Sequence, residues 1–187
     1  MVQNPGHNQV IDDWQCLELA REGDENAWRD LFKRHYPRLV RMAYGITGSF
    51  DTARDMVQES FVRLVQVRIR HRTGSFNSFL STIVYRLALR ERGRASSYDH
   101  SDAIVIADGS PSPLELAIRD DTDRIIVRVI QSLSVEYREI LTLRFFGGHT
   151  YEEIAQITEV PIGTVKSRLF YAIKICRERL KERGVFK

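Results

Sequence analysis

The 187-residue sequence has few of the features that mark secreted, disulfide-bonded or membrane proteins. Its two cysteines, Cys16 and Cys176, lie far apart among apolar residues and have no C-x-x-C partner, so we expect buried thiols rather than a disulfide or a metal site. The apolar runs are only a few residues long, far below the roughly 20 that span a bilayer. The N-terminus has neither the basic start nor the apolar stretch of a secretory signal. We therefore expect no membrane insertion and a cytoplasmic location.

The sequence also has little that indicates an enzyme. Its five histidines are scattered. It shows no glycine-rich phosphate loop, no spacing typical of metal ligands and no plausible nucleophile with its base. We therefore expect no catalytic residues, no metal and no cofactor.

Charge is distributed unevenly along the chain. Residues 60–94 contain eight arginines and one acid, and residues 162–187 contain eight basic residues and two acids. Between them, residues 99–123 contain seven acids and one arginine, together with the prolines of Gly-Ser-Pro-Ser-Pro at 109–113. Two basic modules with an acidic connector suggest contact with a polyanion at two places, the alternative being two solvated basic faces without a ligand.

Helical periodicity dominates the sequence, and strand-like alternation is confined to residues 103–107. We predict an all-α fold of two small helical domains, residues 1–95 and 119–187, joined by a flexible acidic linker at 96–118. Helices are expected at 13–22, from 24 to before Pro37, around 39–46, after an N-cap at Asp51, and at 76–94, 114–133 and 134–146. The helix after Asp51 is expected to bury Ala53, Met56, Val57, Phe61, Leu64 and Val65.

Three arginines recur every four residues on the helix predicted at 76–94. This arginine stripe, Arg86, Arg90 and Arg94, brings like charges together on one helix face, with a single acid, Glu91, nearby. It lowers helix stability unless something anionic neutralises it. The stripe favours a nucleic-acid ligand over a merely solubilising surface.

The segment from Thr150 to Ile175 has the helix-start and turn signals of a helix-turn-helix. Thr150 and Glu153 form a potential capping box, a turn is expected near 158–160, and Pro161 suits the opening of the second helix. In that second helix, apolar residues form a buried seam: Val165, Leu169, Ile173, Cys176 and Leu180. The opposite face is expected to enter the major groove of DNA: Lys166, Ser167, Phe170, Tyr171 and Lys174. Arg168, Arg177 and Lys181 are interpreted as phosphate contacts.

This segment resembles the C-terminal domain of extracytoplasmic-function sigma factors of the sigma-70 family, with their Y-E-E-I-A and G-T-V-K-S-R pattern. The sequence D-M-V-Q-E-S-F-V-R from Asp55 to Arg63 resembles the signature of the family's N-terminal domain, and residues 75–83 resemble its next helix. The matching segments follow the family's order over nearly the whole chain.

The resemblance implies an alternative sigma factor that lends promoter recognition to core RNA polymerase. Implied partners are core RNA polymerase, promoter DNA and an anti-sigma factor. Implied polymerase-binding residues are Asp55, Gln58, Glu59 and Arg63. Residues implied to bind the melted minus-ten strand are Arg70, His71, Arg72, Asn77, Tyr85, Arg86, Arg90 and Arg94. Residues implied to read the minus-thirty-five duplex are Arg144, Lys166, Ser167, Arg168, Phe170, Tyr171 and Lys174.

The sequence departs from the family pattern at two places. Relatives commonly have R-N-x-A-x-D where this chain has Tyr85-Arg86-Leu87-Ala88-Leu89-Arg90, and a basic residue is frequent at the position of Tyr171. Two other readings stay open. One is a helix-turn-helix regulator that binds an operator without sigma activity. The other is a sigma-like protein that only sequesters an anti-sigma factor.

Overall fold

The computed structural model describes residues 12–66, 74–98 and 121–185. Within these ranges the chain forms helices and no strand, which confirms the all-α prediction. The helices are α1 (Asp13–Arg21), α2 (Glu25–Thr47), α3 (Phe50–Gln66), α4 (Phe76–Tyr98), α6 (Asp121–Gln131), α7 (Val135–Phe145), α8 (Tyr151–Thr158) and α9 (Ile162–Glu182). The strand-like residues 103–107, the start of the helix predicted from 114 and most of the expected linker lie outside the described residues.

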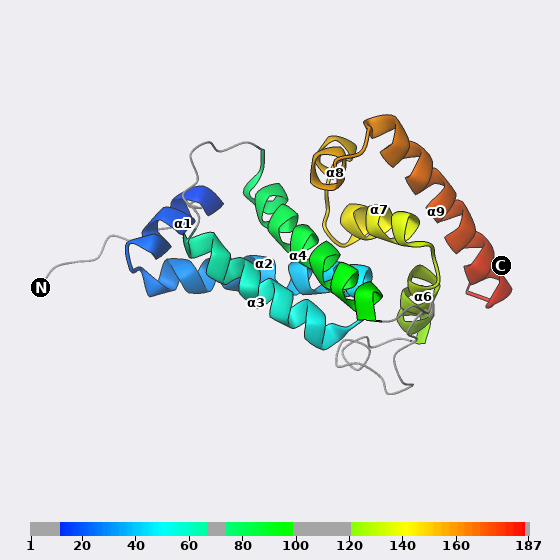
Figure 1. Cartoon of the computed structure of the whole chain (residues 1–187), viewed down its shortest axis with the longest axis horizontal. Helices are drawn as coiled ribbons and strands as arrows, with labels where there is room; N and C mark the ends of the chain where they lie inside the picture. The colour runs from blue at the N-terminus through cyan, green and yellow to red at the C-terminus, as the bar shows by residue number, and fades with distance from the viewer. Residues whose placement is uncertain (1–11, 67–73, 99–120, 186–187) are drawn as a thin grey trace, which may run out of the picture.

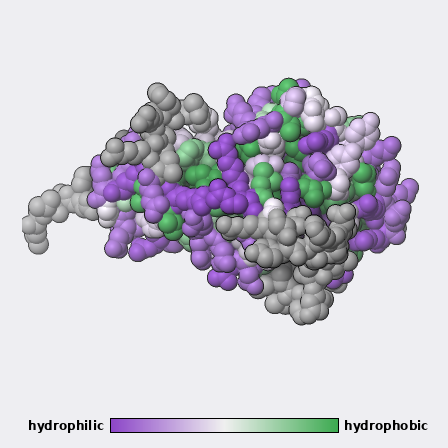
Figure 2. Space-filling view, in the orientation of Figure 1, coloured by the Kyte–Doolittle hydropathy of each residue, from purple (hydrophilic) through white to green (hydrophobic). Residues whose placement is uncertain are grey.

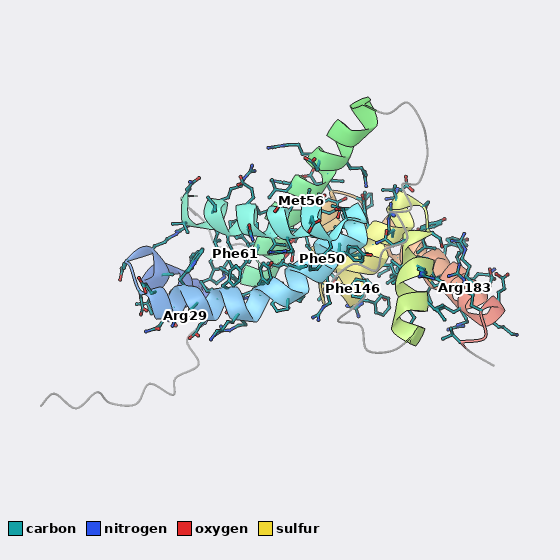
Figure 3. All side chains as sticks on the ribbon, turned by 90° about the horizontal axis from the view of Figure 1, so that it is seen from below. Arg29, Phe50, Met56, Phe61, Phe146 and Arg183 are labelled. Atoms are coloured by element: carbon teal, nitrogen blue, oxygen red, sulfur yellow. The ribbon has the colours of Figure 1, made fainter. Side chains whose placement is uncertain are left out.

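Helices α1 to α4 form the N-terminal half, in which α2 packs against α1, α3 and α4 (Figure 1). Side chains of Asp12 and Asp24 accept hydrogen bonds from the first backbone N–H groups of α1 and α2, which explains where these helices begin. Met56 and Phe61 contribute to the core from α3, and the Phe61 ring meets Trp28 of α2 edge-on at 5.7 Å (Figure 3). Burial of such side chains stabilises the bundle by about 1.5–3 kcal/mol each.

The predicted break at Pro37 is wrong, because α2 continues through it from Glu25 to Thr47. A proline inside a helix removes one hydrogen bond and costs about 3 kcal/mol. Here Pro37 is exposed, while Leu31 before it and Leu39 after it are completely buried. Continuous burial of one helix face on both sides of the proline therefore offsets the local cost.

The start of α3 and part of its predicted core also differ from expectation. The helix begins at Phe50, and the hydroxyl of Ser49 accepts a hydrogen bond from the Thr52 amide at 3.3 Å, so Asp51 lies in the first turn rather than at the N-cap. Val65, predicted to be core, is 46% exposed. It follows the fully buried Leu64, and the turn of about 100° per residue carries it onto the outer face.

Helices α6 to α9 form the C-terminal half, in which α9 packs against α6, α7 and α8. The two halves lie against each other: α2 contacts α7 and α6, and α4 contacts α8 (Figure 1). Buried side chains of both halves belong to one hydrophobic cluster. None of the helices in the described part of the chain is long and apolar enough to cross a membrane.

Candidate nucleic-acid interface

Helices α8 and α9 form the helix-turn-helix that the sequence predicts. The Thr150 hydroxyl accepts from the Glu153 amide at 3.1 Å, and the Glu153 carboxylate accepts from the Thr150 amide at 3.0 Å, so the capping box is present. The turn passes through Glu159, the only non-glycine residue with a positive φ, +58°, in the described ranges. Pro161 is the N-cap of α9, one residue before the position expected for it.

The outward face of α9 carries the predicted groove-facing side chains. Lys166, Ser167, Phe170, Tyr171 and Lys174 are all exposed. The rings of Phe170 and Tyr171 meet edge-on, with their centroids 5.4 Å apart. On the opposite face Val165 and Leu169 are buried as expected, whereas Ile173 and Cys176 are half-buried. Figure 2 shows hydrophilic side chains over the outer edge of the C-terminal half, where α9 lies.

Two further residues implied to bind the duplex, Arg144 and Arg168, are less exposed. Arg144, in the last turn of α7, is half-buried and donates to the carbonyl oxygen of His149 at 2.7 Å. Its guanidinium carbon also lies 5.2 Å from the centre of the Tyr151 ring. Arg168 is half-buried on α9. Arg144 thus braces the loop before α8.

The arginine stripe lies on α4. Arg86 and Arg90 are exposed, and the side chain of Arg94 lies outside the described residues. Arg86 donates to Glu159 of the helix-turn-helix at 3.0 Å. In this structure the charge of Arg86 is therefore paired with a carboxylate of the same chain. The minus-ten candidates Arg70, His71 and Arg72 also fall outside the described ranges.

The remaining minus-ten candidates, Asn77 and Tyr85, contact the C-terminal half. The Asn77 amide donates to the Gly147 carbonyl oxygen at 3.1 Å. Tyr85 is only 5% exposed, and its hydroxyl donates to Glu139 of α7 at 2.9 Å. Burial and the neighbouring Glu139 raise the pKa of Tyr85 above its ordinary value. In this arrangement Tyr85 cannot meet a base, because its ring is buried and its hydroxyl is hydrogen-bonded to Glu139.

A buried histidine lies beside the Asn77 contact. His149 is fully buried, with Nδ1 3.5 Å from the Glu153 carboxylate. Burial lowers the pKa of His149 below its ordinary value, although Glu153 opposes this effect. Burial also disfavours ionised Glu153, but hydrogen bonds from Ser75 and the Thr150 amide lower the pKa of Glu153 overall. His149 is therefore neutral near pH 7 and fills space between the halves.

The face of α3 implied to bind polymerase is exposed. Asp55, Gln58 and Glu59 face solvent, and Arg63 donates to Glu59 at 2.7 Å. A groove of about 350 Å³ between α3 and α4 places Asp55 and Glu59 across from Arg90. Sequence reasoning missed two residues on this helix, Val62 and Val65, which are 52% and 46% exposed. Each valine directly follows an apolar residue that is buried, Phe61 or Leu64, and the turn of about 100° per residue places it on the next face; these adjacent apolar pairs are the signal that could have found them.

Sequence reasoning also missed that acidic residues of the C-terminal half contact α4 and Ser75 just before it. They are Glu139 on α7, Glu153 on α8 and Glu159 after α8. Their partners in the N-terminal half lie between 47 and 78 positions away in the chain. No local pattern predicts such pairs. Among the described residues no group of histidine, cysteine and acidic side chains could hold a metal ion.

Two family models match the chain. The model described as Sigma-70 region 2 matches residues 31–98, and the model described as Sigma-70, region 4 matches residues 123–176. The first match covers most of α2 with α3 and α4, and the second covers α6 to α8 with most of α9. The fold and these matches define a helical transcription protein of the sigma-70 type.

Similar proteins narrow this class. The chain is 30% identical over 177 residues to an ECF RNA polymerase sigma-E factor of Salmonella typhimurium, covering 88% of this chain and 92% of the relative. It is 28% identical over 181 residues to an RNA polymerase sigma-H factor of Pseudomonas aeruginosa, covering 86% and 89%. The chain belongs to the family of ECF RNA polymerase sigma factors.

Solved structures agree with this assignment. The sigma factor RpoE of Bartonella quintana, solved in complex with the anti-sigma factor NepR, matches with a TM-score of 0.61 and 26% identity over 82% of this chain and 96% of that one. CnrH, solved with the cytosolic domain of CnrY, matches with a TM-score of 0.65 and 20% identity. The match covers 91% of this chain and 97% of CnrH, which supports the fold. The protein is an alternative sigma factor directing transcription, and its family consists of initiation factors rather than catalysts.

Proposed function

We propose that the chain binds core RNA polymerase and directs it to promoters through one DNA-binding surface in each half. Residues 1–95 bind the polymerase clamp and the melted minus-ten strand, residues 119–187 read the minus-thirty-five duplex, and residues 96–118 link them. The exposed polar and aromatic face of α9, presented by a capped helix-turn-helix, is the observation that carries the proposal.

The duplex is read by the early turns of α9. Lys166 can donate to guanine, Ser167 to several bases, and the exposed Phe170 ring can meet a thymine methyl group. Arg168 contacts phosphates, Lys174 extends the groove-facing surface, and Tyr171 adds aromatic surface beside Phe170. Arg144 acts mainly by holding the loop before α8, since its guanidinium already donates to His149.

The melted strand is bound along α4. Single-strand binding requires a basic surface that follows the backbone together with polar and aromatic groups for bases. Arg86 and Arg90 are exposed and supply the basic surface. Asn77 and Tyr85 join them once the halves separate. Arg70, His71, Arg72 and Arg94 belong to the same proposed surface.

Core polymerase is bound by the outer face of α3. Asp55, Gln58, Glu59 and Arg63 form its polar part. We add Val62 and Val65, because an apolar pair within a polar rim is typical of a protein-binding surface. An anti-sigma factor is a further proposed partner, in line with the relative solved in complex with NepR. We also propose that the chain works in the cytoplasm and has no catalytic activity of its own.

Transcription with core polymerase tests the proposal through charge-reversed variants. Lys166→Glu places an acid on the duplex-reading face, and Arg90→Glu places one on the single-strand face. We expect both to abolish promoter-directed transcription. Lys33→Glu makes the same charge change at an exposed position of α2 and is expected to leave transcription intact.

The rival functions predict other results. An operator-binding regulator binds duplex DNA tightly by itself but never redirects core polymerase. A sequestering decoy gives no transcription in any form. Either outcome would reject the proposed function.

A further inference from the structure

The C-terminal half presents three carboxylates to the edge of the N-terminal half that is proposed to bind single-stranded DNA. We call Glu139, Glu153 and Glu159 the acidic face. Glu153 accepts a hydrogen bond from the Ser75 hydroxyl, just before α4, at 2.6 Å. Glu159 accepts from the Arg86 guanidinium at 3.0 Å. These carboxylates occupy donors on α4 and just before it that a nucleic-acid backbone would use.

Glu139 makes the most buried of these contacts. It is 7% exposed and accepts from the Tyr85 hydroxyl at 2.9 Å and from the Arg92 guanidinium. A buried carboxylate that loses its partners is strongly destabilising, so this cluster either stays intact or opens completely to water. It therefore favours two distinct states, halves together or halves apart.

Glu159 is held in a strained conformation at the turn of the helix-turn-helix. Its φ of +58° lies in the left-handed region, which glycine adopts without strain and a glutamate does not. The side chain at this strained position reaches Arg86 of the arginine stripe.

The donors that the acidic face engages are those that proteins use to bind DNA phosphates. Arginine guanidinium groups and the side chains of serine and tyrosine are among the groups that make such contacts. A carboxylate resembles a phosphate in charge and in its accepting oxygens, and both bind arginine through the same fork of donors. The acidic face thus has the chemistry of a short stretch of nucleic-acid backbone.

We propose that the acidic face is an internal mimic of the DNA backbone, which keeps the free chain closed until polymerase and promoter DNA displace it. The inference rests on the proposed function, since it needs α4 to be the single-strand surface. In the closed state Asn77, Tyr85 and Arg86 are occupied by the chain's own C-terminal half. Single-stranded DNA and the acidic face therefore compete for the same side chains.

Neutralising two members of the acidic face tests the proposal on the full chain. Glu153→Gln with Glu159→Gln removes two charges, and glutamine at 153 can still complete the capping box. The matched control, Glu152→Gln with Glu182→Gln, makes the same charge change at exposed positions of the same half. The probe is a fluorescein-labelled mixed-sequence single strand of DNA, measured by anisotropy, and small-angle X-ray scattering gives the radius of gyration.

We expect the Glu153–Glu159 variant to bind the single strand about tenfold more tightly than the control variant, with a larger radius of gyration. Equal affinities, including no binding by either variant, would overturn the internal mimic. Run-off transcription by the unmodified chain, measured in parallel, separates the two failures. If that transcription succeeds and the affinities are equal, only the mimic is rejected. If it fails, the proposed function is rejected on its own evidence.

Discussion

A Cβ atom placed on Gly45 would lie 2.6 Å from Cγ2 of Thr142, although the two residues belong to different halves of the chain. Real Cβ atoms essentially never show such a distance. Gly45 lies in the last turn of α2, and glycine inside a helix costs about 0.5–1 kcal/mol of helix stability relative to alanine. That cost is accepted where it allows α2 and α7 to pack closely.

Gly45→Ala is therefore expected to weaken the contact between the halves. The added methyl group meets the Thr142 side chain, and overpacking of this kind costs about 1–3 kcal/mol. Small-angle scattering measures the resulting increase in radius of gyration. Gly93→Ala on α4 is the matched control, since a Cβ there meets nothing within 4 Å. A Gly45 variant as compact and as stable as the control would show that the close approach has no energetic role.

Thr150→Ala is expected to lower the free energy of unfolding by about 1 kcal/mol, because it removes the hydroxyl that caps α8. Thr150→Ser keeps that hydroxyl and is expected to lose much less. Urea unfolding followed by circular dichroism compares the two variants. The capping box would be energetically unimportant if alanine and serine gave the same midpoint.

Stability is expected to fall as the solution becomes acidic, because two histidines are buried in the neutral form. His35 is 2% exposed, and burial lowers its pKa below the ordinary value, although Asp13 opposes this effect. The pKa of His149 is lowered for the same reason. Below about pH 6.5 the unfolded chain then binds more protons than the folded chain. The free energy of unfolding is therefore unaffected by these two histidines above that pH and decreases as the pH falls below it.

Urea unfolding between pH 7.5 and 5.5 measures this dependence. His149→Gln removes one titrating group and is expected to flatten the pH profile relative to the unmodified chain. A variant profile as steep as the original would mean that His149 does not contribute. A stability that rises toward pH 5.5 would contradict the account for both histidines.

Replacing Val62 and Val65 by aspartate is expected to weaken binding to core polymerase by tenfold or more, on the order of 1.4 kcal/mol, because it charges the proposed apolar contact. Both side chains face solvent, so the stability of the free chain is expected to change little. Titration of labelled chain with core polymerase measures the affinity. Gln15→Asp with Asn26→Asp adds the same charge at exposed positions of α1 and α2 and is expected to bind normally. Equal affinities for both double variants would exclude the valine pair from the interface.

Local sequence patterns predicted the elements of this fold better than their assembly. The capping box of Thr150 and Glu153 and the exposed face from Lys166 to Lys174 follow from residues within one or two turns of each other. The continuity of α2 through Pro37 could not be predicted, because it depends on burial against other helices. The hydrogen bond from Tyr85 to Glu139 joins two residues that are 54 positions apart in the sequence. Such contacts follow from the packing of the two halves, which the hydrophobic periodicity of the sequence does not predict.

Run-off transcription with purified core polymerase, on a template that contains the DNA upstream of the protein's own gene, tests the central claim most directly. The account predicts a discrete transcript when chain and core polymerase are present together, and none with either alone. The account would be contradicted if the protein bound duplex DNA by itself but core polymerase made no new transcript in its presence, on this or other genomic fragments.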